Sequence, residues 1–282
     1  MSGASANLRA CCPTDAAVKH ILSRENPHFK ALKKLCQSGR ERRKTGRIVL
    51  DGMHLIESLV ASGCLPIEIV VSESGQGKDE IAHFLETISA TQTVTLLADS
   101  LFDDLAPVET PSGILAVAEK PRDSGAIDLR GDAILLDGVQ DPGNVGSILR
   151  TAAAAGFKQV LLSEDCAQVW SPKVLRAGMG AHFLLELSEA ISLKEFLEKY
   201  RGLALLTTLD EKAGALYELD LRPSVAWIFG NEGQGVRPDL AEIVRHHARI
   251  PMPGACESLN VAAAAAICLF ETVRQRGVSV KR

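Results

Sequence analysis

The segment AILLDGVQDPGNVGSILRTAAAAGF, residues 133–157, joins an apolar run to a glycine-bearing turn and then to an alanine-rich stretch. A short apolar run that ends in turn residues predicts a buried strand, and the stretch from 144 to 155 predicts a helix. The turn carries Gly143-x-x-Gly146 rather than the G-x-G-x-x-G of dinucleotide sites. The helix after this turn carries Arg150. The geometry of a tight turn does not require an arginine there, so Arg150 is a candidate catalytic or binding residue.

Two later stretches share this composition: IFGNEGQGV, residues 228–236, and IPMPGACESLNVAAAAA, residues 250–266. Each follows an apolar strand and combines small residues with uncharged polar ones. Taken alone, each is compatible with a plain turn, with Asn144 or Ser258 as a helix cap. In an open α/β sheet, however, ligands bind beyond the carboxyl ends of strands, so the three stretches together predict one site.

The rest of the chain alternates strands with helices, which predicts an α/β fold of two domains. The apolar residues from Ile21 to Leu35 recur at helical spacing, so residues 18–45 are expected to be helical. Further helices are expected at 79–90, from Ser100, at 172–180, 192–200, 238–246 and 258–276. We divide the chain into a disordered lead (1–17), a small α/β domain (18–120), a linker (121–131) and a second α/β domain (132–282) with a parallel sheet.

Charge is distributed unevenly along the 282 residues, although the net charge is only −4. Residues 19–47 contain ten Lys or Arg and two Glu, a balance of +8, while residues 1–18 balance at zero, so residues 48–282 carry −12. A basic segment on an acidic body indicates contact with a polyanion such as RNA. The alternative for such a segment is a solvated helix face.

Several classes of protein fit the sequence poorly. The seven cysteines form no C-x-x-C pair and the histidines are scattered, so we expect no metal site and no disulfide framework, as suits a cytoplasmic protein. The longest apolar run near the C-terminus, VAAAAAICLF, is too short to span a membrane, and the N-terminus lacks the apolar core of a secretory signal. A phosphate-binding loop of the G-x-x-x-x-G-K-[ST] type does not occur either.

The three stretches suit a ligand with a flat base, a ribose and a zwitterionic tail, and S-adenosylmethionine has that shape. DPGNVGSILRTAAAAGF, IFGNEGQGV and IPMPGACESLNVAAAAAICLFE, in this order, resemble the three signature motifs of the SpoU, or TrmH-type, RNA 2′-O-ribose methyltransferases of the SPOUT superfamily. The resemblance covers about residues 130–276. FKALKKL and GRIVLDGMHLIESLVASG look more loosely like the family's substrate-binding domain, which is similar to ribosomal protein L30.

The resemblance implies a deep trefoil knot in the C-terminal domain, a homodimer, and S-adenosylmethionine as cofactor. It carries catalytic roles to Arg150 and Asn144 of the first motif, Glu232 of the second, and Ser258 and Asn260 of the third. It assigns cofactor binding to Leu206, Thr207, Gly230, Ile250 and Leu259. One departure is Ala262, where many family members carry serine.

The role of Arg150 stays open at this point. Family accounts make this arginine the proton acceptor, but a charged guanidinium has no acceptor atom. It can instead hold an RNA phosphate and stabilise the oxyanion that develops on the ribose. Glu232 is expected either to orient Arg150 or to accept a hydrogen bond from a loop amide.

The substrate also stays open. Ribosomal RNA of the large subunit is favoured by the resemblance, because a leading domain of this kind usually accompanies that substrate. Transfer RNA is the alternative within the enzyme class. Outside it, the alternatives are a catalytically silent RNA-binding protein and a nucleotide-dependent oxidoreductase.

Overall fold

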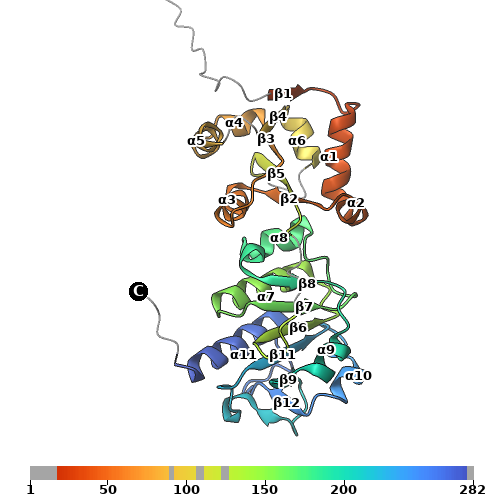
Figure 1. The fold of residues 1–282 in the computed structure, drawn as a ribbon, viewed down its shortest axis with the longest axis vertical. Coiled ribbons are helices and arrows are strands. Elements are labelled where there is room, and N and C mark those ends of the chain that lie inside the picture. Colours follow the sequence, from red (N-terminus) through yellow and green to blue (C-terminus); the bar gives the residue numbers. More distant parts are fainter. Residues whose placement is uncertain (1–17, 89–91, 106–110, 122–126, 278–282) are drawn as a thin grey trace, which may run out of the picture.

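The computed structural model describes residues 18–88, 92–105, 111–121 and 127–277. They form two α/β parts, each with one sheet, that follow one another along the long axis of the molecule (Figure 1). The first sheet has five strands in the order β1-β4-β3-β5-β2. The strands β2 and β3 pair antiparallel with β5, whereas β4 pairs parallel with β1 and β3. The elements are β1 (Val18–Ile21), α1 (Pro27–Gln37), α2 (Gly39–Thr45), β2 (Arg47–Asp51), α3 (Met53–Ala61), β3 (Glu68–Ser72), α4 (Glu73–Gln76), α5 (Asp79–Thr87), β4 (Thr93–Leu97), α6 (Asp99–Leu105) and β5 (Ile114–Glu119).

The second sheet has seven strands in the order β10-β12-β9-β11-β6-β7-β8, and its pairings are parallel. Parallel strands are covered on both faces, which explains why every residue of AILLD in β6 and VAWIFG in β11 is buried. The elements are β6 (Ala133–Asp137), α7 (Pro142–Ala154), β7 (Gln159–Leu162), α8 (Pro172–Gly178), η1 (Ala181–Leu184), β8 (Glu186–Ser188), α9 (Leu193–Lys199), β9 (Leu203–Thr207), β10 (Gly214–Ala215), η2 (Leu216–Glu218), β11 (Val225–Gly230), α10 (Pro238–Ala241), β12 (His246–Arg249) and α11 (Val261–Gln275).

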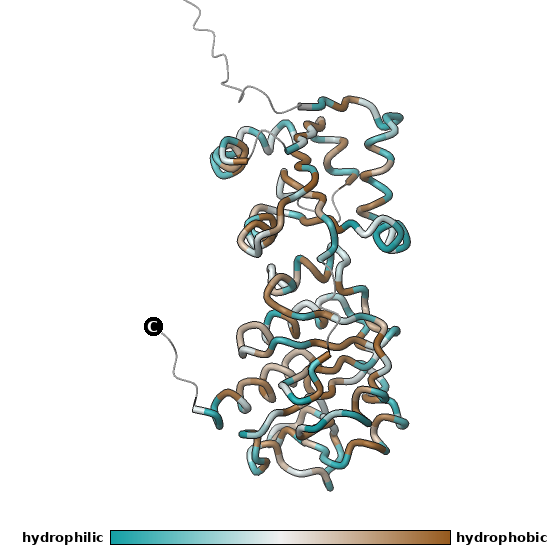
Figure 2. The backbone as a smooth tube through the Cα atoms, viewed as in Figure 1, coloured by the Kyte–Doolittle hydropathy of each residue, from teal (hydrophilic) through white to brown (hydrophobic). Residues whose placement is uncertain are grey.

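The two sheets are joined by direct packing as well as by the chain. Figure 1 shows α8 between them, and Figure 2 shows apolar residues along the strands on both sides. One apolar core contains Leu50 of β2 together with Ile134 of β6. Arg176 of α8 lies 3.6 Å from the buried carboxylate of Asp51, which adds a polar contact between the two parts.

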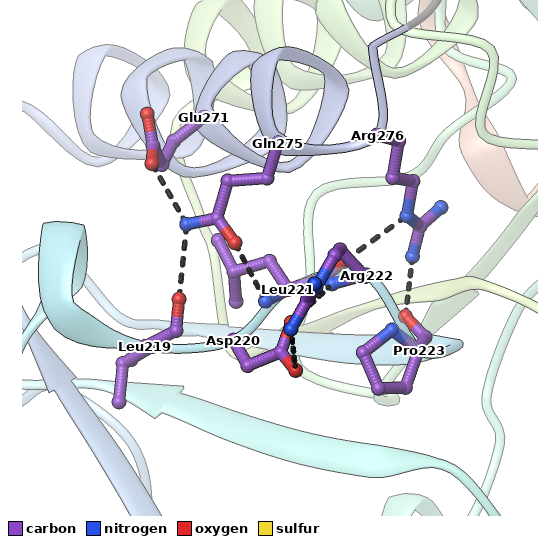
Figure 3. A network of polar contacts seen from close by, with 8 residues as sticks. All are labelled: Leu219, Asp220, Leu221, Arg222, Pro223, Glu271, Gln275 and Arg276. Carbon is purple, nitrogen blue, oxygen red and sulfur yellow. Dashed lines mark hydrogen bonds and ion pairs between the residues drawn. The ribbon is translucent and has the colours of Figure 1, made fainter.

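The C-terminal end of α11 is fastened to residues 219–223, the segment before β11 (Figure 3). Gln275 donates to Leu219 O at 2.9 Å and accepts from the amide of Leu221 at 2.9 Å. Arg276 donates to Pro223 O at 2.6 Å and pairs with Asp132, the residue before β6. These bonds fix α11, whose other end reaches the candidate site described below.

The predicted α/β class with a parallel sheet is confirmed, but the prediction of helix across residues 18–45 is wrong at its start. Residues Val18–Ile21 form β1, which pairs parallel with Thr93–Leu97 of β4. That pairing joins segments far apart in sequence, so local helical spacing could not reveal it. The helix α1 begins only at Pro27, where the side chain of Asn26 accepts from the amide of His28.

Several predicted helix starts and ends are also wrong. The helix α11 begins at Val261 rather than Ser258, because Asn260 provides the cap and accepts from the amides of Ala262 and Ala263. Asp141 rather than Asn144 caps α7. The helix α6 begins at Asp99, and α10 ends at 241 because the residues from 246 on form β12.

The two sheets fall on either side of the predicted linker at 121–131, of which residues 122–126 lie outside the described residues, as does the predicted disordered lead at 1–17. The domain boundaries therefore stay predictions. Strand order does not describe how a chain threads, so the trefoil knot stays a prediction too. Among the described residues, no helix is long and apolar enough to span a membrane.

Candidate cofactor and RNA site

A cavity of about 730 Å³ lies beyond the carboxyl ends of β9, β11 and β12, beside the start of α11. This is the position that the sequence predicted, because parallel strands bring their carboxyl ends to one edge of a sheet. All five residues predicted to bind the cofactor line the cavity: Leu206 and Thr207 at the end of β9, Gly230 at the end of β11, Ile250 after β12, and Leu259 before α11.

The charges of the cavity wall select the kind of ligand. The described residues that line it include the carboxylates of Asp210 and Glu232 but no lysine or arginine. A phosphate group would therefore find neither a lysine nor an arginine to pair with here, whereas a ligand with a positive centre would not be repelled by one. This distribution fits a sulfonium compound better than a phosphate-bearing nucleotide.

Gly230 cannot be replaced by a larger residue without moving the backbone around it. A Cβ at this position would lie 2.2 Å from Gly235 C and 2.3 Å from Val236 N. The strand end and the returning loop therefore touch backbone to backbone. This close approach puts main chain rather than side chain at this part of the cavity wall, which suits a ligand bound by amide and carbonyl groups.

Asn231 closes the second-motif loop and ties it to the first motif. Its main chain exchanges hydrogen bonds of 2.9 Å with Gly235 in both directions. Its side-chain oxygen accepts from the amides of Gly233 and Gln234, and its side-chain nitrogen donates to Gly138 O at 2.8 Å. Asn231 was not predicted from the sequence as a site residue, although its position directly after Gly230 could have indicated a structural role in this loop.

Hydrogen bonds between three side chains link the three motifs. Asn260 donates to Asn144 Oδ1 at 2.8 Å, and Asn144 donates to Glu232 Oε1 at 2.9 Å. Glu232 also accepts from the amides of Asp141 at 3.1 Å and Gln140 at 3.3 Å. The structure thus brings together three of the predicted catalytic residues, and it shows the second of the two roles expected for Glu232.

These hydrogen bonds determine the ionisation of Glu232. Partial burial raises the pKa of its carboxyl, but the hydrogen bonds from Asn144 and from the two loop amides outweigh that effect, so the pKa lies below its usual 4.5. Glu232 is therefore a carboxylate at neutral pH. As an acceptor of three hydrogen bonds it fixes the first-motif turn rather than offering itself as a base.

The remaining two predicted catalytic residues lie apart from this chain of hydrogen bonds. Ser258 is exposed and lines the cavity. Arg150 is exposed on α7, about a turn and a half beyond Asn144, and its side chain makes no hydrogen bond or ion pair within the described part of the chain. The guanidinium is therefore available to a ligand that approaches α7 from solvent.

Asp137 is a second residue that sequence analysis missed. Its carboxylate at the end of β6 is 1% exposed and accepts from the amide of Arg237 at 2.8 Å, while Arg237 Nε lies 2.8 Å from its other oxygen. The contact holds the far end of the second-motif loop against β6. A carboxylate that ends a fully apolar strand was the available signal.

Comparison with known proteins agrees with this geometry. The SpoU rRNA Methylase family matches residues 132–270, and the MRM3-like substrate binding domain matches residues 26–116. An uncharacterized tRNA/rRNA methyltransferase of Synechocystis is 33% identical, covering 94% of this chain and 97% of that protein. The 23S rRNA (guanosine(2553)-2′-O)-methyltransferase RlmP of Bacillus subtilis is 32% identical, covering 90% and 98%.

Among solved structures, the SpoU methyltransferase AviRb from Streptomyces viridochromogenes, in complex with the cofactor AdoMet, superposes with a TM-score of 0.78. It is 25% identical, and the match covers 89% of this chain and 98% of that one. The resemblance drawn from the three motifs, and that of the N-terminal part to a substrate-binding domain, are confirmed.

Proposed function

The chain belongs to the SpoU rRNA methylase family, and from that membership and its site we propose that it is an S-adenosylmethionine-dependent methyltransferase of a ribose 2′-hydroxyl in ribosomal RNA. The proposal rests mainly on two features of the site that lie next to each other. The cofactor cavity has no lysine or arginine among its described lining residues, and hydrogen bonds link Asn260 and Glu232 at its edge through Asn144 of α7.

The cavity fits S-adenosylmethionine in size, charge and surface. Its volume of about 730 Å³ lies within the usual range for small-molecule sites. Ile250 and Leu259 offer apolar surface to the adenine, while the bare backbone at Gly230 lets main-chain groups approach the ligand. The cofactor, once bound, supplies an activated methyl group on a sulfonium.

The protein's own residues then position the RNA and assist the loss of the proton from the ribose 2′-hydroxyl. Arg150 grips an RNA phosphate with its planar fork, holds the ribose, and stabilises the negative charge that develops on the 2′-oxygen. Because a charged guanidinium has no acceptor atom, the proton leaves to a phosphate oxygen or to water. Asn144 and Glu232 keep the first-motif turn in place, and this alignment lowers the barrier.

We also propose a homodimer that contacts through the free face of α11. Phe270 on that helix is 49% exposed and offers apolar surface that a second copy could cover. The change Phe270→Glu is expected to give a monomer in sedimentation experiments. A dimer that survives this change would rule out that surface.

Ribosomal RNA is preferred over transfer RNA because the 23S rRNA enzyme RlmP is matched along 98% of its length and the substrate-binding domain is present. Such a substrate implies a cytoplasmic location. The test uses RNA from a strain that lacks the gene, separated into large-subunit rRNA, small-subunit rRNA and tRNA, with methyl-labelled S-adenosylmethionine. We expect label in large-subunit rRNA. Label in tRNA alone would establish the alternative substrate, and no label in any fraction would favour a silent RNA-binding protein.

Cofactor choice has a separate test that needs no RNA. S-adenosylhomocysteine should raise the melting temperature of the protein, because a ligand that binds only the folded state stabilises it, whereas NAD should not. Protection by NAD would support the oxidoreductase alternative.

A further inference from the structure

A second cavity, of about 570 Å³, lies where the N-terminal part meets the methyltransferase part. One wall comes from α1, α2 and the end of α6, and the other from the starts of α7 and α8 and the loop between β7 and α8. Its lining residues include Cys36, Gln37, Arg42, Leu105, Pro142 and Lys173.

The chemistry of this cavity is opposite to that of the cofactor cavity. The described residues that line it include the cations Arg42 and Lys173 and no carboxylate. Buried Cys36 and Leu105 give it an apolar floor, and Pro142 adds apolar surface beside them. An apolar floor under cationic groups suits a ligand with a flat base and a phosphate, which is the chemistry of a nucleotide in single-stranded RNA.

Arg42 is held in place without a counter-ion. Its Nη1 donates to the carbonyls of Leu35 and Cys36 at 3.0 Å each, and its Nη2 donates to Gln168 Oε1 at 3.3 Å. In the described part of the chain its Nε–H makes no hydrogen bond and no carboxylate pairs with it. Partial burial lowers the pKa of this guanidinium, and an anion in the cavity would relieve that cost.

The cavity also stands next to the reaction site. Pro142, which lines it, directly follows Asp141, whose amide donates to Glu232 of the cofactor cavity at 3.1 Å. On its other side lies α2, which Figure 2 shows as hydrophilic. The exposed cations on and beside α2, none of which has an ion-pair partner among the described residues, are Arg40, Arg43, Lys44 and Arg47.

We propose that this second cavity is an RNA subsite, which receives an unstacked nucleotide near the target ribose, with the base on the apolar floor and a phosphate between Arg42 and Lys173. The inference rests on the proposed function, because it assumes an RNA substrate. This subsite would connect the basic N-terminal segment with the reaction site. An RNA strand bound across α2 would enter the cavity before it reaches the first-motif turn.

The test changes each wall separately. Lys173→Glu alters the methyltransferase wall and Gln37→Glu the N-terminal wall, and both side chains are exposed, so both variants should fold. Lys194→Glu is the matched control, because it makes the same charge change at an exposed position of α9 outside the cavity. Lys173→Arg keeps the positive charge.

RNA binding is measured by fluorescence anisotropy with a short fluorescein-labelled oligouridylate over a range of salt concentrations. The KM is measured with large-subunit rRNA as substrate.

We expect Lys173→Glu to weaken RNA binding about tenfold and to lower the slope of log K against log salt by about 0.7, the value for one lost contact to a single strand. Gln37→Glu should weaken binding in the same direction, and KM should rise while kcat and the affinity for S-adenosylhomocysteine stay unchanged. Lys173→Arg and Lys194→Glu should bind like the unmodified protein. The proposal is overturned if either wall variant binds RNA as tightly as Lys194→Glu.

This result is distinguishable from a failure of the proposed function. Binding is read without methyl transfer, so the comparison between wall variants and control stands whether or not the protein transfers a methyl group. A protein that binds RNA through this cavity but labels no RNA would retain the subsite and lose the enzymatic role.

Discussion

Replacing Gly230 by alanine should separate cofactor binding from folding. A Cβ at this position would lie 2.2 Å from Gly235 C, 2.3 Å from Val236 N and 2.5 Å from Gly235 O. These are backbone atoms, so no side-chain rotation can relieve the contact. The loop must move by roughly 1 Å before carbon atoms reach an ordinary separation.

That movement affects the bonds that shape the cavity wall. The two 2.9 Å hydrogen bonds between Asn231 and Gly235 join the same two strands of chain that the new methyl group would push apart. Overpacking of this kind costs about 1–3 kcal/mol, and each lost hydrogen bond costs about 1 kcal/mol. If this cost falls on the loop that holds the cofactor, affinity should fall about tenfold to a hundredfold.

The assay is calorimetric titration with S-adenosylhomocysteine, and Gly254→Ala is the matched control. Gly254 belongs to the third motif, and a Cβ there would meet no atom within 4 Å. We expect the control to bind the ligand normally and both variants to show the circular dichroism of the unmodified protein. Equal affinities for the two folded variants would refute the claim that the backbone contact at Gly230 shapes the cofactor site.

Three other predictions concern catalysis, pH and stability. Arg150→Ala should reduce methyl transfer by about a hundredfold or more and leave S-adenosylhomocysteine affinity within about twofold, because this exposed side chain does not line the cofactor cavity; near-normal turnover would remove its role. Burial lowers the pKa of His182 to about 4, although its hydrogen bond to a backbone carbonyl opposes the shift. The unfolded chain therefore takes up a proton below pH 6.5 and the folded chain does not, so the free energy of unfolding should fall by up to about 3 kcal/mol as pH drops from 6.5 to 4. Urea titrations should show a smaller fall for His182→Gln, and an equal fall would contradict this source. Arg276→Ala should cost about 2 kcal/mol of unfolding free energy, because it leaves the half-buried Asp132 without its charged partner, whereas Lys199→Ala, which removes only an exposed pair with Glu195 within α9, should cost less than about 1 kcal/mol; equal midpoints in urea would refute the difference.

The cofactor side of the site could be predicted from sequence because its parts follow strand ends. Gly230 is the last residue of the apolar strand β11 and Ile250 directly follows β12, and parallel strands bring such ends together. The motif resemblance added Asn144, Glu232 and Asn260, which the structure joins in one chain of hydrogen bonds.

What could not be predicted depends on contacts between segments distant in sequence. The strand β1 exists because it pairs with β4, so helical spacing in its neighbourhood gave the wrong prediction. The bond from Asn231 to Gly138 O and the cavity between α2 and α8 each need two separate elements to be placed first. Local capping was ambiguous for a different reason, since Ser258 and Asn260 are both good caps and only the path of the loop selects the second.

The central claim is that this chain transfers a methyl group from S-adenosylmethionine to a ribose 2′-hydroxyl in ribosomal RNA. The most direct measurement is nucleoside mass spectrometry of large-subunit rRNA from a strain lacking the gene, after incubation with the protein and a cofactor that carries a deuterated methyl group. The account predicts one nucleoside with a heavy methyl on its ribose, present with the unmodified protein and strongly reduced with Arg150→Ala. A heavy methyl on a base, or none on any nucleoside, would contradict it.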